Sequence, residues 1–310
     1  MLTESTAPPA GAVPPDVTAT SLTRADVAGL LRVPTAADHK YTRGVVGVVA
    51  GTERYPGAAV LCASGALLSG AGMVRYLGPP TVGQMVLNAH PEIVLGSGQV
   101  QAWVLGSGVP LPSSGDPDGG QTERIRAALA QAGGTLPGIG SAVPAVVDAG
   151  ALPAIQKPLP PWVVMTPHAG ELATYLTAHG QPTKRSEVEA NPLAAMRKAQ
   201  QIFGGTILLK GSPTLVLGAD GEVYCQAEAP HWLATAGAGD VLAGLLGTML
   251  AARAADVVKS PPLAARIAAA AAYLHGRAAA EVNPGGPVTA SQVAAQLPAT
   301  IAEVLRATPE

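Results

Sequence analysis

Aromatic residues make up only 3% of this 310-residue chain, so its core must be built from Ala, Val and Leu. Cysteine is also scarce: Cys62 and Cys225 are far apart and match no metal-ligand spacing. We interpret both as small buried hydrophobic residues of a protein in a reducing compartment. The formal net charge is −2, which gives no electrostatic basis for a nucleic-acid partner.

The chain also lacks long hydrophobic runs and a recognisable targeting segment. Its longest uncharged apolar run follows Asp240 and stops at Arg253, which is shorter than the ~20 residues that span a bilayer. Residues 1–21 have neither a basic start nor an apolar middle, and their Pro, Ala and Thr content is typical of a disordered tail. We therefore expect no membrane partner and a cytoplasmic location.

What is present is an alternation of strands and helices. The apolar run 44–51, bounded by glycine, is typical of a strand buried on both faces. The alternation predicts an α/β fold with a central, mostly parallel sheet and helices on both faces. Further strands are expected at 73–78, 92–96, 102–106, 144–148, 161–166 and 205–210, and helices at 57–70, 121–132, 169–179, 190–203, 240–254 and 263–281.

Two late strands, 213–218 and 222–227, are predicted to form a hairpin, because Asp220-Gly221 between them favours a tight turn. The segments 109–120 and 180–189 are expected to be surface loops, and neither indicates a domain boundary. We therefore predict one domain over residues 22–310.

The stretch Thr235–Asp240 carries the clearest chemical signal. Gly237 and Gly239 precede Asp240, and an apolar, helix-like run follows at once. Glycine lets a ligand come close to the backbone, and the unpaired N–H groups of a helix start favour an anion. A carboxylate beside that anion suits a reaction in which a hydroxyl loses its proton and attacks a phosphoryl group. The sequence therefore predicts an anion-binding helix start with a base, Asp240, beside it.

Further polar clusters follow predicted strands, where parallel α/β sheets bind their ligands. His168, in Thr166-Pro-His-Ala-Gly-Glu171, is predicted at a helix start, where it either donates to a substrate or simply stands exposed. A second cluster is either a nucleotide-binding loop or an ordinary turn with a surface lysine. It consists of Lys210, Gly211, Ser212, Pro213 and Thr214.

Asp148 also follows a predicted strand, and it either holds magnesium through water or serves as a buried cap. The segment Gly106-Ser-Gly108 lacks the third glycine of the dinucleotide-binding fingerprint, and the P-loop lysine pattern is absent. Both absences disfavour a hydride-transfer fold and a P-loop enzyme.

Nine short motifs occur in a recognisable order. They are Tyr55-Pro-Gly-Ala-Ala59, Gly70-Ala-Gly-Met-Val74, His90-Pro-Glu92, Leu105-Gly-Ser-Gly108, Val146-Val-Asp148-Ala149, Thr166-Pro-His-Ala-Gly-Glu171, Leu209-Lys-Gly211, Thr235-Ala-Gly-Ala-Gly-Asp240 and Tyr273-Leu-His-Gly276. The set resembles the ADP-dependent NAD(P)H-hydrate dehydratases, a branch of the ribokinase-like fold, over roughly residues 22–300. Many kinases of that fold share the Gly-x-Gly-Asp motif, so the Tyr-Pro-Gly-Ala and Thr-Pro-His-x-Gly-Glu motifs select the branch.

The resemblance implies a function: the family repairs NADH or NADPH that has added water across the nicotinamide ring. It implies that Asp240 is the base facing the hydrate hydroxyl. It implies that Ala58, Gly108 and His168 contact the hydrated dinucleotide. It also implies that Lys210 through Thr214, with Gly237 and Gly239, hold the adenine nucleotide. ADP as co-substrate, a Mg²⁺ requirement without assigned ligands, and a homo-oligomer follow from the same match.

The chain departs from the family pattern at three places. It has Gly106-Ser-Gly-Val-Pro110 where Gly-Pro-Gly-Leu-Gly is usual, Gly150 where a second acid is usual, and His231-Trp-Leu where Pro-Gly-Met is common. These changes concern the substrate loop and the metal contacts. The family often carries a fused epimerase, for which we expect no room ahead of Gly44.

Two alternatives stay open. A kinase for a small alcohol, such as a vitamin precursor, would stop at a stable phosphate ester. A catalytically silent nucleotide-binding module would bind ADP without turnover. The silent module ranks last, because Asp240 and both glycines are intact.

Overall fold

Short apolar segments form nine strands in the part of the chain that this computed structural model describes, residues 19–111, 117–134 and 142–306. The strands are β1 Val45–Val49, β2 Met73–Tyr76, β3 Val94–Leu95, β4 Ala102–Leu105, β5 Ala145–Val147, β6 Val163–Met165, β7 Thr206–Leu209, β8 Thr214–Leu217 and β9 Val223–Gln226. Every residue of β1, β4, β5, β6 and β7 is buried, as expected for strands covered on both faces. All the predicted strands are confirmed.

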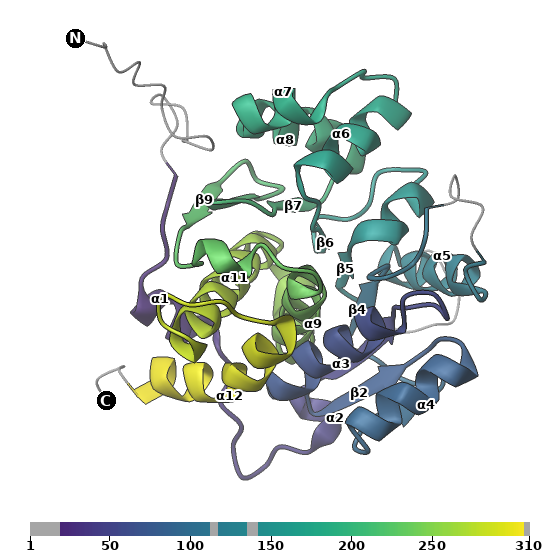
Figure 1. Cartoon of the computed structure of the whole chain (residues 1–310), viewed down its shortest axis with the longest axis vertical. Coiled ribbons are helices and arrows are strands. Elements are labelled where there is room, and N and C mark those ends of the chain that lie inside the picture. Colours follow the sequence, from purple (N-terminus) through teal and green to yellow (C-terminus); the bar gives the residue numbers. More distant parts are fainter. Residues whose placement is uncertain (1–18, 112–116, 135–141, 307–310) are drawn as a thin grey trace.

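The strands form one sheet in the order β3-β2-β1-β4-β5-β6-β7-β8-β9 (Figure 1). Strands β1 to β7 pair in parallel, and β8 and β9 are antiparallel to their neighbours. The predicted hairpin is therefore confirmed. Because β4 to β7 run in the same direction, the loops that follow them gather at one edge of the sheet.

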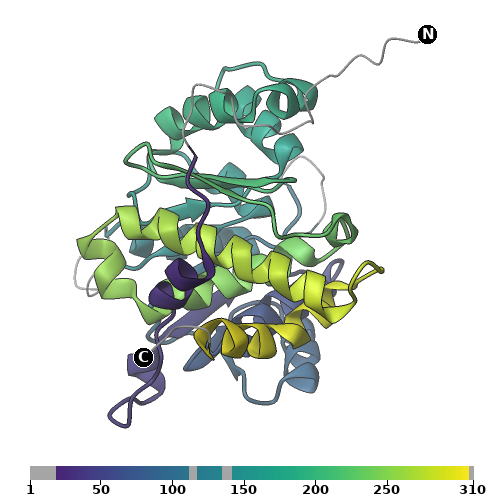
Figure 2. The ribbon, with the colours of Figure 1, turned by 90° about the vertical axis from the view of Figure 1, so that its left-hand side faces the viewer.

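Helices cover both faces of this sheet (Figures 1 and 2). One apolar core lies between the sheet and α1, α3, α9, α11 and α12, and the other lies between the sheet and α5, α6 and α8. The helices are α1 Arg24–Leu30, α2 Lys40–Arg43, α3 Pro56–Leu68, α4 Pro80–Ala89, α5 Gln121–Ala132, α6 Ala169–Ala178, α7 Arg185–Ala190, α8 Pro192–Phe203, α9 Ala238–Ala252, α10 Ala254–Lys259, α11 Pro262–Val282 and α12 Ala290–Arg306, with 3₁₀ turns η2 Ala149–Ala154 and η3 His231–Leu233. Across the described ranges, no helix is long and apolar enough to cross a bilayer.

Helices α3 and α9 pack backbone against backbone. A Cβ on Gly65 would lie 2.4 Å from the Val241 carbonyl oxygen, and a Cβ on Gly244 would lie 2.1 Å from the Cys62 carbonyl oxygen. Only glycine permits this approach. Small residues thus replace the aromatic residues that the chain lacks, and they hold α9 rigidly against its neighbour.

The last residues of the predicted tail, 19–21, belong to the described part of the chain. Residues 1–18 lie outside the described part, but Thr20 pairs with the open edge of β9. Its N–H donates to the Val223 carbonyl (2.9 Å), and its carbonyl accepts from the Cys225 N–H (3.0 Å). An edge strand leaves backbone groups unpaired, which explains why a polar segment is drawn onto it.

Several predicted helices and loops need correction. The surface loop 180–189 contains the start of α7, and α4 and the 3₁₀ turn η2 were not predicted. The helix expected over 240–254 corresponds to α9, and a further short helix, α10, follows Arg253 and was not predicted. In the loop 109–120, residues 112–116 lie outside the described part.

The two cysteines differ in burial. Cys62 is fully buried, as predicted, whereas Cys225 on β9 is only half-buried. Both thiols are free.

Candidate active site

Helix α9 begins where the glycine motif predicts. Its N-cap, Gly237, has φ +85°, in the left-handed region that favours glycine. No side chain caps this helix. The Ala238 N–H donates to the Thr235 carbonyl (3.4 Å), which leaves the N–H groups of Gly239 and Asp240 open to an anion. Asp240 lies in that first turn and is half-buried. The acid and the helix start therefore share one site at the carboxyl edge of the sheet.

The surroundings of Asp240 raise its pKa to about 7. Burial is the largest cause, and the neighbouring Asp148 carboxylate adds to it. The Lys210 ammonium and a hydrogen bond with Ser107 act in the opposite direction. A carboxyl group that titrates near neutral pH is a stronger base than an ordinary aspartate, and about half of it is ionised at pH 7.

Asp148, directly after β5, is 2% exposed and accepts three side-chain hydrogen bonds. Ser107 Oγ donates at 3.0 Å, Thr166 Oγ1 at 2.9 Å and Lys210 Nζ at 2.8 Å. These donors follow β4, β6 and β7. Asp148 therefore ties together the carboxyl ends of adjacent strands, which favours its interpretation as a buried structural acid.

Lys210 lies between two acids. Its Nζ is 2.8 Å from Asp148 Oδ1 and 3.5 Å from Glu171 Oε2. Burial favours the neutral amine, but the two carboxylates outweigh it and raise the pKa of Lys210, so the ammonium stays charged. The alternative of a surface lysine is wrong, because the side chain is only 20% exposed.

Lys210 also faces the start of α9. A Cβ on Gly239 would lie 3.3 Å from Lys210 Nζ. The ammonium and the open N–H groups of the helix thus approach the same point, and both favour negative charge there. The sequence predicts an anion site at this helix start, and the charge of Lys210 is compatible with that prediction.

His168 is the N-cap of α6. Its Nδ1 accepts from the N–H groups of Gly170 (3.0 Å) and Glu171 (3.1 Å), and its own N–H donates to Glu171 Oε2 (2.8 Å). Because Nδ1 is an acceptor, the neutral ring carries its proton on Nε2. The ring is exposed. His168 is therefore exposed at the helix start, as predicted, and it also caps the helix, which was not predicted. Its Nε2 lies 3.5 Å from Glu171 Oε1, and donation to a substrate stays a prediction.

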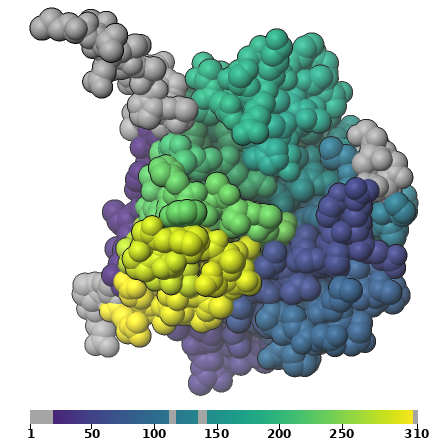
Figure 3. Space-filling view, viewed as in Figure 1, coloured from purple at the N-terminus to yellow at the C-terminus, as the bar shows by residue number. Residues whose placement is uncertain are grey.

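Two cavities meet at His168. One, of about 470 Å³, is lined by Lys210, Gly211, Ser212, Thr214 and Gly239 among others. The other, of about 900 Å³, is lined by Tyr55, Gly108 and His168 among others. On the face shown in Figure 3, the α6–α8 region, the segment between β9 and α9, and the region around α3 adjoin one another. The predicted nucleotide residues and the predicted substrate residues thus line separate but neighbouring spaces.

Four predicted site residues are absent from these two linings: Ala58, Pro213, Gly237 and Asp240. Asp240 adjoins the smaller cavity through its neighbour Gly239, which lines it. A Cβ on Gly108 would lie 2.3 Å from Ala58 Cβ, so Ala58 backs the wall that Gly108 forms. Gly237 shapes the turn before α9, and Pro213 lines an adjoining cavity of about 440 Å³ that His168 and Lys210 also line. The Thr214 hydroxyl donates to the Gly211 carbonyl at 3.2 Å, within its own loop.

A direct magnesium site does not fit these residues. Within the described ranges, no group of three His, Cys, Asp or Glu residues is placed to hold a metal ion. Asp148 is occupied by Lys210 and two hydroxyls. A Cβ on Gly150 would lie 2.0 Å from the Val109 carbonyl oxygen, so this backbone has no room for the second acid of the family pattern.

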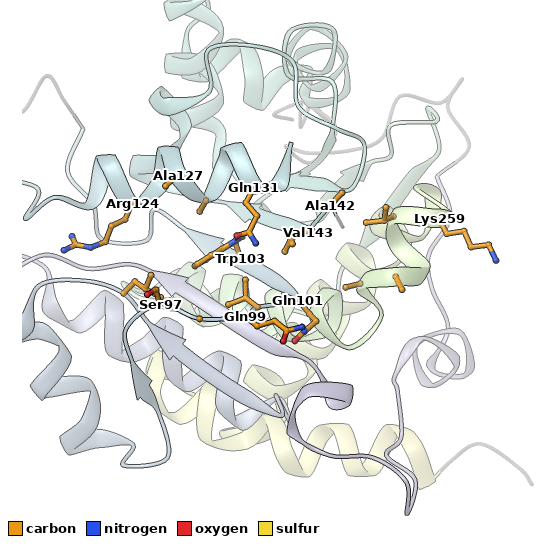
Figure 4. Close-up of a pocket in the computed structure, with 17 residues that line it drawn as sticks. Ser97, Gln99, Gln101, Trp103, Arg124, Ala127, Gln131, Ala142, Val143 and Lys259 are labelled. Carbon is orange, nitrogen blue, oxygen red and sulfur yellow. The ribbon is translucent and has the colours of Figure 1, made fainter. Parts of the chain in front are cut away.

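A cavity larger than either of these, of about 1030 Å³, lies elsewhere. Figure 4 shows Gln101, Trp103 and Val143 in its wall, near the starts of β4 and β5. This is the edge of the sheet opposite Asp148 and Lys210. The Trp103 Nε1–H already donates to Gln131 Oε1 at 2.8 Å. Size alone therefore does not identify the active site here; the convergence of charged groups does.

Sequence reasoning gave no role to Ser107, Glu171 or His275, although each lies in a quoted motif. Ser107 and Glu171 follow strand ends, a position that could have indicated them. His275 is the single histidine of an Ala-rich apolar helix, which is a weaker signal.

Comparison with known proteins agrees with this geometry. The NAD(P)H-hydrate dehydratase family model matches residues 46–299. The chain belongs to this family. The match begins within β1 and ends within α12, so it includes every strand and the whole candidate site.

Members of the family resemble the chain over most of its length. An ADP-dependent (S)-NAD(P)H-hydrate dehydratase of Neisseria meningitidis is 34% identical over 278 residues, which cover 84% of each chain. A bifunctional NAD(P)H-hydrate repair enzyme Nnr of Mycobacterium leprae is 37% identical over 306 residues, 93% of this chain and 57% of that enzyme. The chain thus spans about half the length of the bifunctional relatives it matches.

Solved structures confirm the ribokinase-like fold. A ribokinase-like superfamily protein from Enterococcus faecalis matches with a TM-score of 0.73 at 20% identity, over 92% of this chain and 95% of that one. The ADP/ATP-dependent NAD(P)H-hydrate dehydratase of Bacillus subtilis, co-crystallised with ATP and Mg²⁺, also has a TM-score of 0.73, at 24% identity, over 92% and 99%.

Proposed function

We propose that the chain is a hydro-lyase that dehydrates (S)-NAD(P)H hydrate to NAD(P)H at the expense of ADP, with AMP and phosphate as the other products. One observation carries the proposal: a half-buried Asp240 with a pKa of about 7 lies beside an uncapped helix start and a charged lysine. Family membership and the name of the Neisseria meningitidis relative support the same reaction.

The two cavities suggest how the substrates are arranged. ADP occupies the smaller cavity, with its terminal phosphate between Lys210 and the N–H groups after Gly239. The hydrated nicotinamide occupies the larger cavity, against the Gly108–Ala58 wall, where His168 Nε2–H donates to it. Asp240 then lies between the hydroxyl and the phosphate.

The chemistry follows from this arrangement. Asp240 takes the proton of the hydroxyl, whose oxygen attacks the terminal phosphorus of ADP while the bond to the AMP oxygen breaks. Lys210 and the α9 N-terminus stabilise the charge on the transferring group. The hydroxyl has become a phosphate ester, a better leaving group than hydroxide. The ring nitrogen lone pair expels phosphate, and loss of a proton from the neighbouring ring carbon restores the double bond.

The decisive experiment incubates the purified protein with NADH hydrate and ADP and follows the absorbance of reduced nicotinamide. Recovery of that absorbance, with AMP and phosphate in equal amounts, supports the proposal. A stable phosphorylated alcohol, formed from some other substrate, would identify a small-alcohol kinase instead. Binding of ADP with no turnover would support the silent module.

We also propose that residues 22–310 act as one catalytic domain and that the protein is a homo-oligomer. The second statement comes from the family resemblance alone. Light scattering after size-exclusion chromatography measures the mass in solution and tests it directly.

A further inference from the structure

His275, on α11, has a ring nitrogen without a partner. The residue is 5% exposed, and its Nε2 makes no hydrogen bond. An unpaired polar atom in the interior is destabilising, so its presence calls for an explanation. His275 lines the same 470 Å³ cavity as Lys210 and Gly239. The residue therefore borders the space proposed above for ADP.

The other nitrogen of the ring determines what Nε2 can do. The ring makes a hydrogen bond with the backbone of Ala238, the first residue of α9, and this bond favours the protonated ring. It therefore joins a ring N–H to the Ala238 carbonyl. Burial outweighs this bond and lowers the pKa of His275 to about 4, so the ring is neutral at neutral pH. A neutral ring that donates through one nitrogen accepts through the other, so Nε2 is an acceptor.

An acceptor in a nucleotide cavity is selective. It offers nothing to a phosphate, whose oxygens are themselves acceptors. It matches a donor on the nucleoside part of the ligand, and adenosine has two kinds, the 6-amino group of the base and the ribose hydroxyls. Positively charged Lys210 and the helix start serve the phosphates on the same cavity wall.

We propose that His275 is a nucleotide-specificity residue, whose Nε2 accepts a hydrogen bond from the nucleoside of ADP while its other nitrogen holds the first residue of α9. This inference rests on the proposed function for the presence of ADP. It adds a contact that links recognition of the nucleoside to the helix that carries Asp240.

The test measures binding by calorimetry, so it does not depend on turnover. ADP, inosine diphosphate, 2′-deoxy-ADP and 3′-deoxy-ADP are titrated into the wild type and into His275→Leu and His275→Gln. Inosine diphosphate lacks the 6-amino donor, and each deoxy compound lacks one hydroxyl. We expect His275→Leu to weaken ADP binding about tenfold, as loss of one buried hydrogen bond does. His275→Gln, which keeps an acceptor, should recover part of that loss.

The analogue that lacks the relevant donor should bind the wild type about tenfold more weakly and should lose nothing further in His275→Leu. The identity of that analogue shows whether the group that donates to Nε2 belongs to the base or to the sugar. Equal binding of all four nucleotides to the wild type would overturn the inference. So would a loss in His275→Leu that is the same for every nucleotide, because it would show that the ring only packs or holds water. If ADP does not bind the wild type at all, the proposed function fails instead.

Discussion

Lys210 and Asp148 form an ion pair beneath the site, with 2.8 Å between Nζ and Oδ1 and with Asp148 almost wholly buried. Removing one partner of a buried pair leaves an uncompensated charge. We expect Lys210→Met to lower the free energy of unfolding by about 3 kcal/mol, measured by urea denaturation. Lys210→Met with Asp148→Asn should recover part of that loss. The matched control is Arg126→Met, which breaks the exposed pair with Glu123 and should cost under about 1 kcal/mol. Equal losses in both single variants would contradict a buried pair.

Asp240→Asn should abolish turnover while leaving the fold and ADP binding in place. The amide is nearly the same size as the acid but cannot accept the hydroxyl proton. A positioned base contributes about 10²–10⁴-fold, so the rate of NADH recovery should fall by at least that factor. Circular dichroism and ADP titration serve as the controls. A variant that retains near-normal dehydration would refute the base assignment.

The rate should depend on the ionisation of Asp240. Because its pKa is about 7, kcat/KM should fall about tenfold for each pH unit below that value and level off above it. A flat profile between pH 5 and pH 8, roughly the range in which this group titrates, would contradict the raised pKa. The wild-type pH–rate profile is also the reference against which the Ser107→Ala variant is compared.

The ionisation of Asp240 should also affect stability. Whereas ionisation raises the rate, it should lower the free energy of unfolding. Folding raises the pKa of Asp240 from 3.8 to about 7, so the ionised folded state is disfavoured at neutral and alkaline pH. Asp240→Asn should therefore be more stable than the wild type above pH 7, by about 1–2 kcal/mol when partial exposure is allowed for. The difference should shrink as the pH falls from 7 towards 4, because the folded wild type then takes up the proton. Urea denaturation across this range tests the sign; a difference that grows on acidification would contradict it.

Most of the fold could be predicted because its signals are local. A run such as Val45–Val49 is short and apolar at every position, which is typical of a strand covered on both faces. Helix α4 escaped prediction because Pro79, Pro80 and Gly83 read as turn residues. Proline is in fact favoured at the first helical position, which Pro80 occupies.

The site residues also divide into those with a local signal in the sequence and those without one. Asp240 was visible because its glycines and its helix adjoin it in the sequence. The contact of Lys210 with Asp148 joins residues 62 positions apart, so no local pattern carries it. The free nitrogen of His275 depends on which groups fail to reach it, and only the assembled interior shows that.

Gly239→Ala should weaken nucleotide binding without harming the fold. The new methyl would lie 3.3 Å from Lys210 Nζ, at the end of a flexible side chain that can move aside, so it occupies the space meant for the anion. We expect ADP binding to weaken about tenfold or more, since charge-assisted hydrogen bonds at this point are lost. The control is Gly29→Ala in helix α1, where an added Cβ meets nothing within 4 Å. That variant should keep its ADP affinity and gain up to ~1 kcal/mol of stability. Unchanged ADP binding in Gly239→Ala would exclude the helix start as the phosphate site.

Ser107 stands where the family pattern usually has proline, and its hydroxyl interacts with both acids, Asp148 and Asp240. Its single proton is donated either to Asp148, at 3.0 Å, or to Asp240, and the bond to Asp240 lowers the pKa of the base. Ser107→Ala should therefore move the midpoint of the pH–rate profile to higher pH, so that the rate near pH 7 falls while the alkaline plateau is kept. Thr166→Val is the matched control, because Thr166 donates to Asp148 but does not contribute to the pKa of Asp240. It should lose about 1 kcal/mol of stability with its midpoint unmoved. Identical midpoints in both variants and the wild type would show that Ser107 has only a structural role.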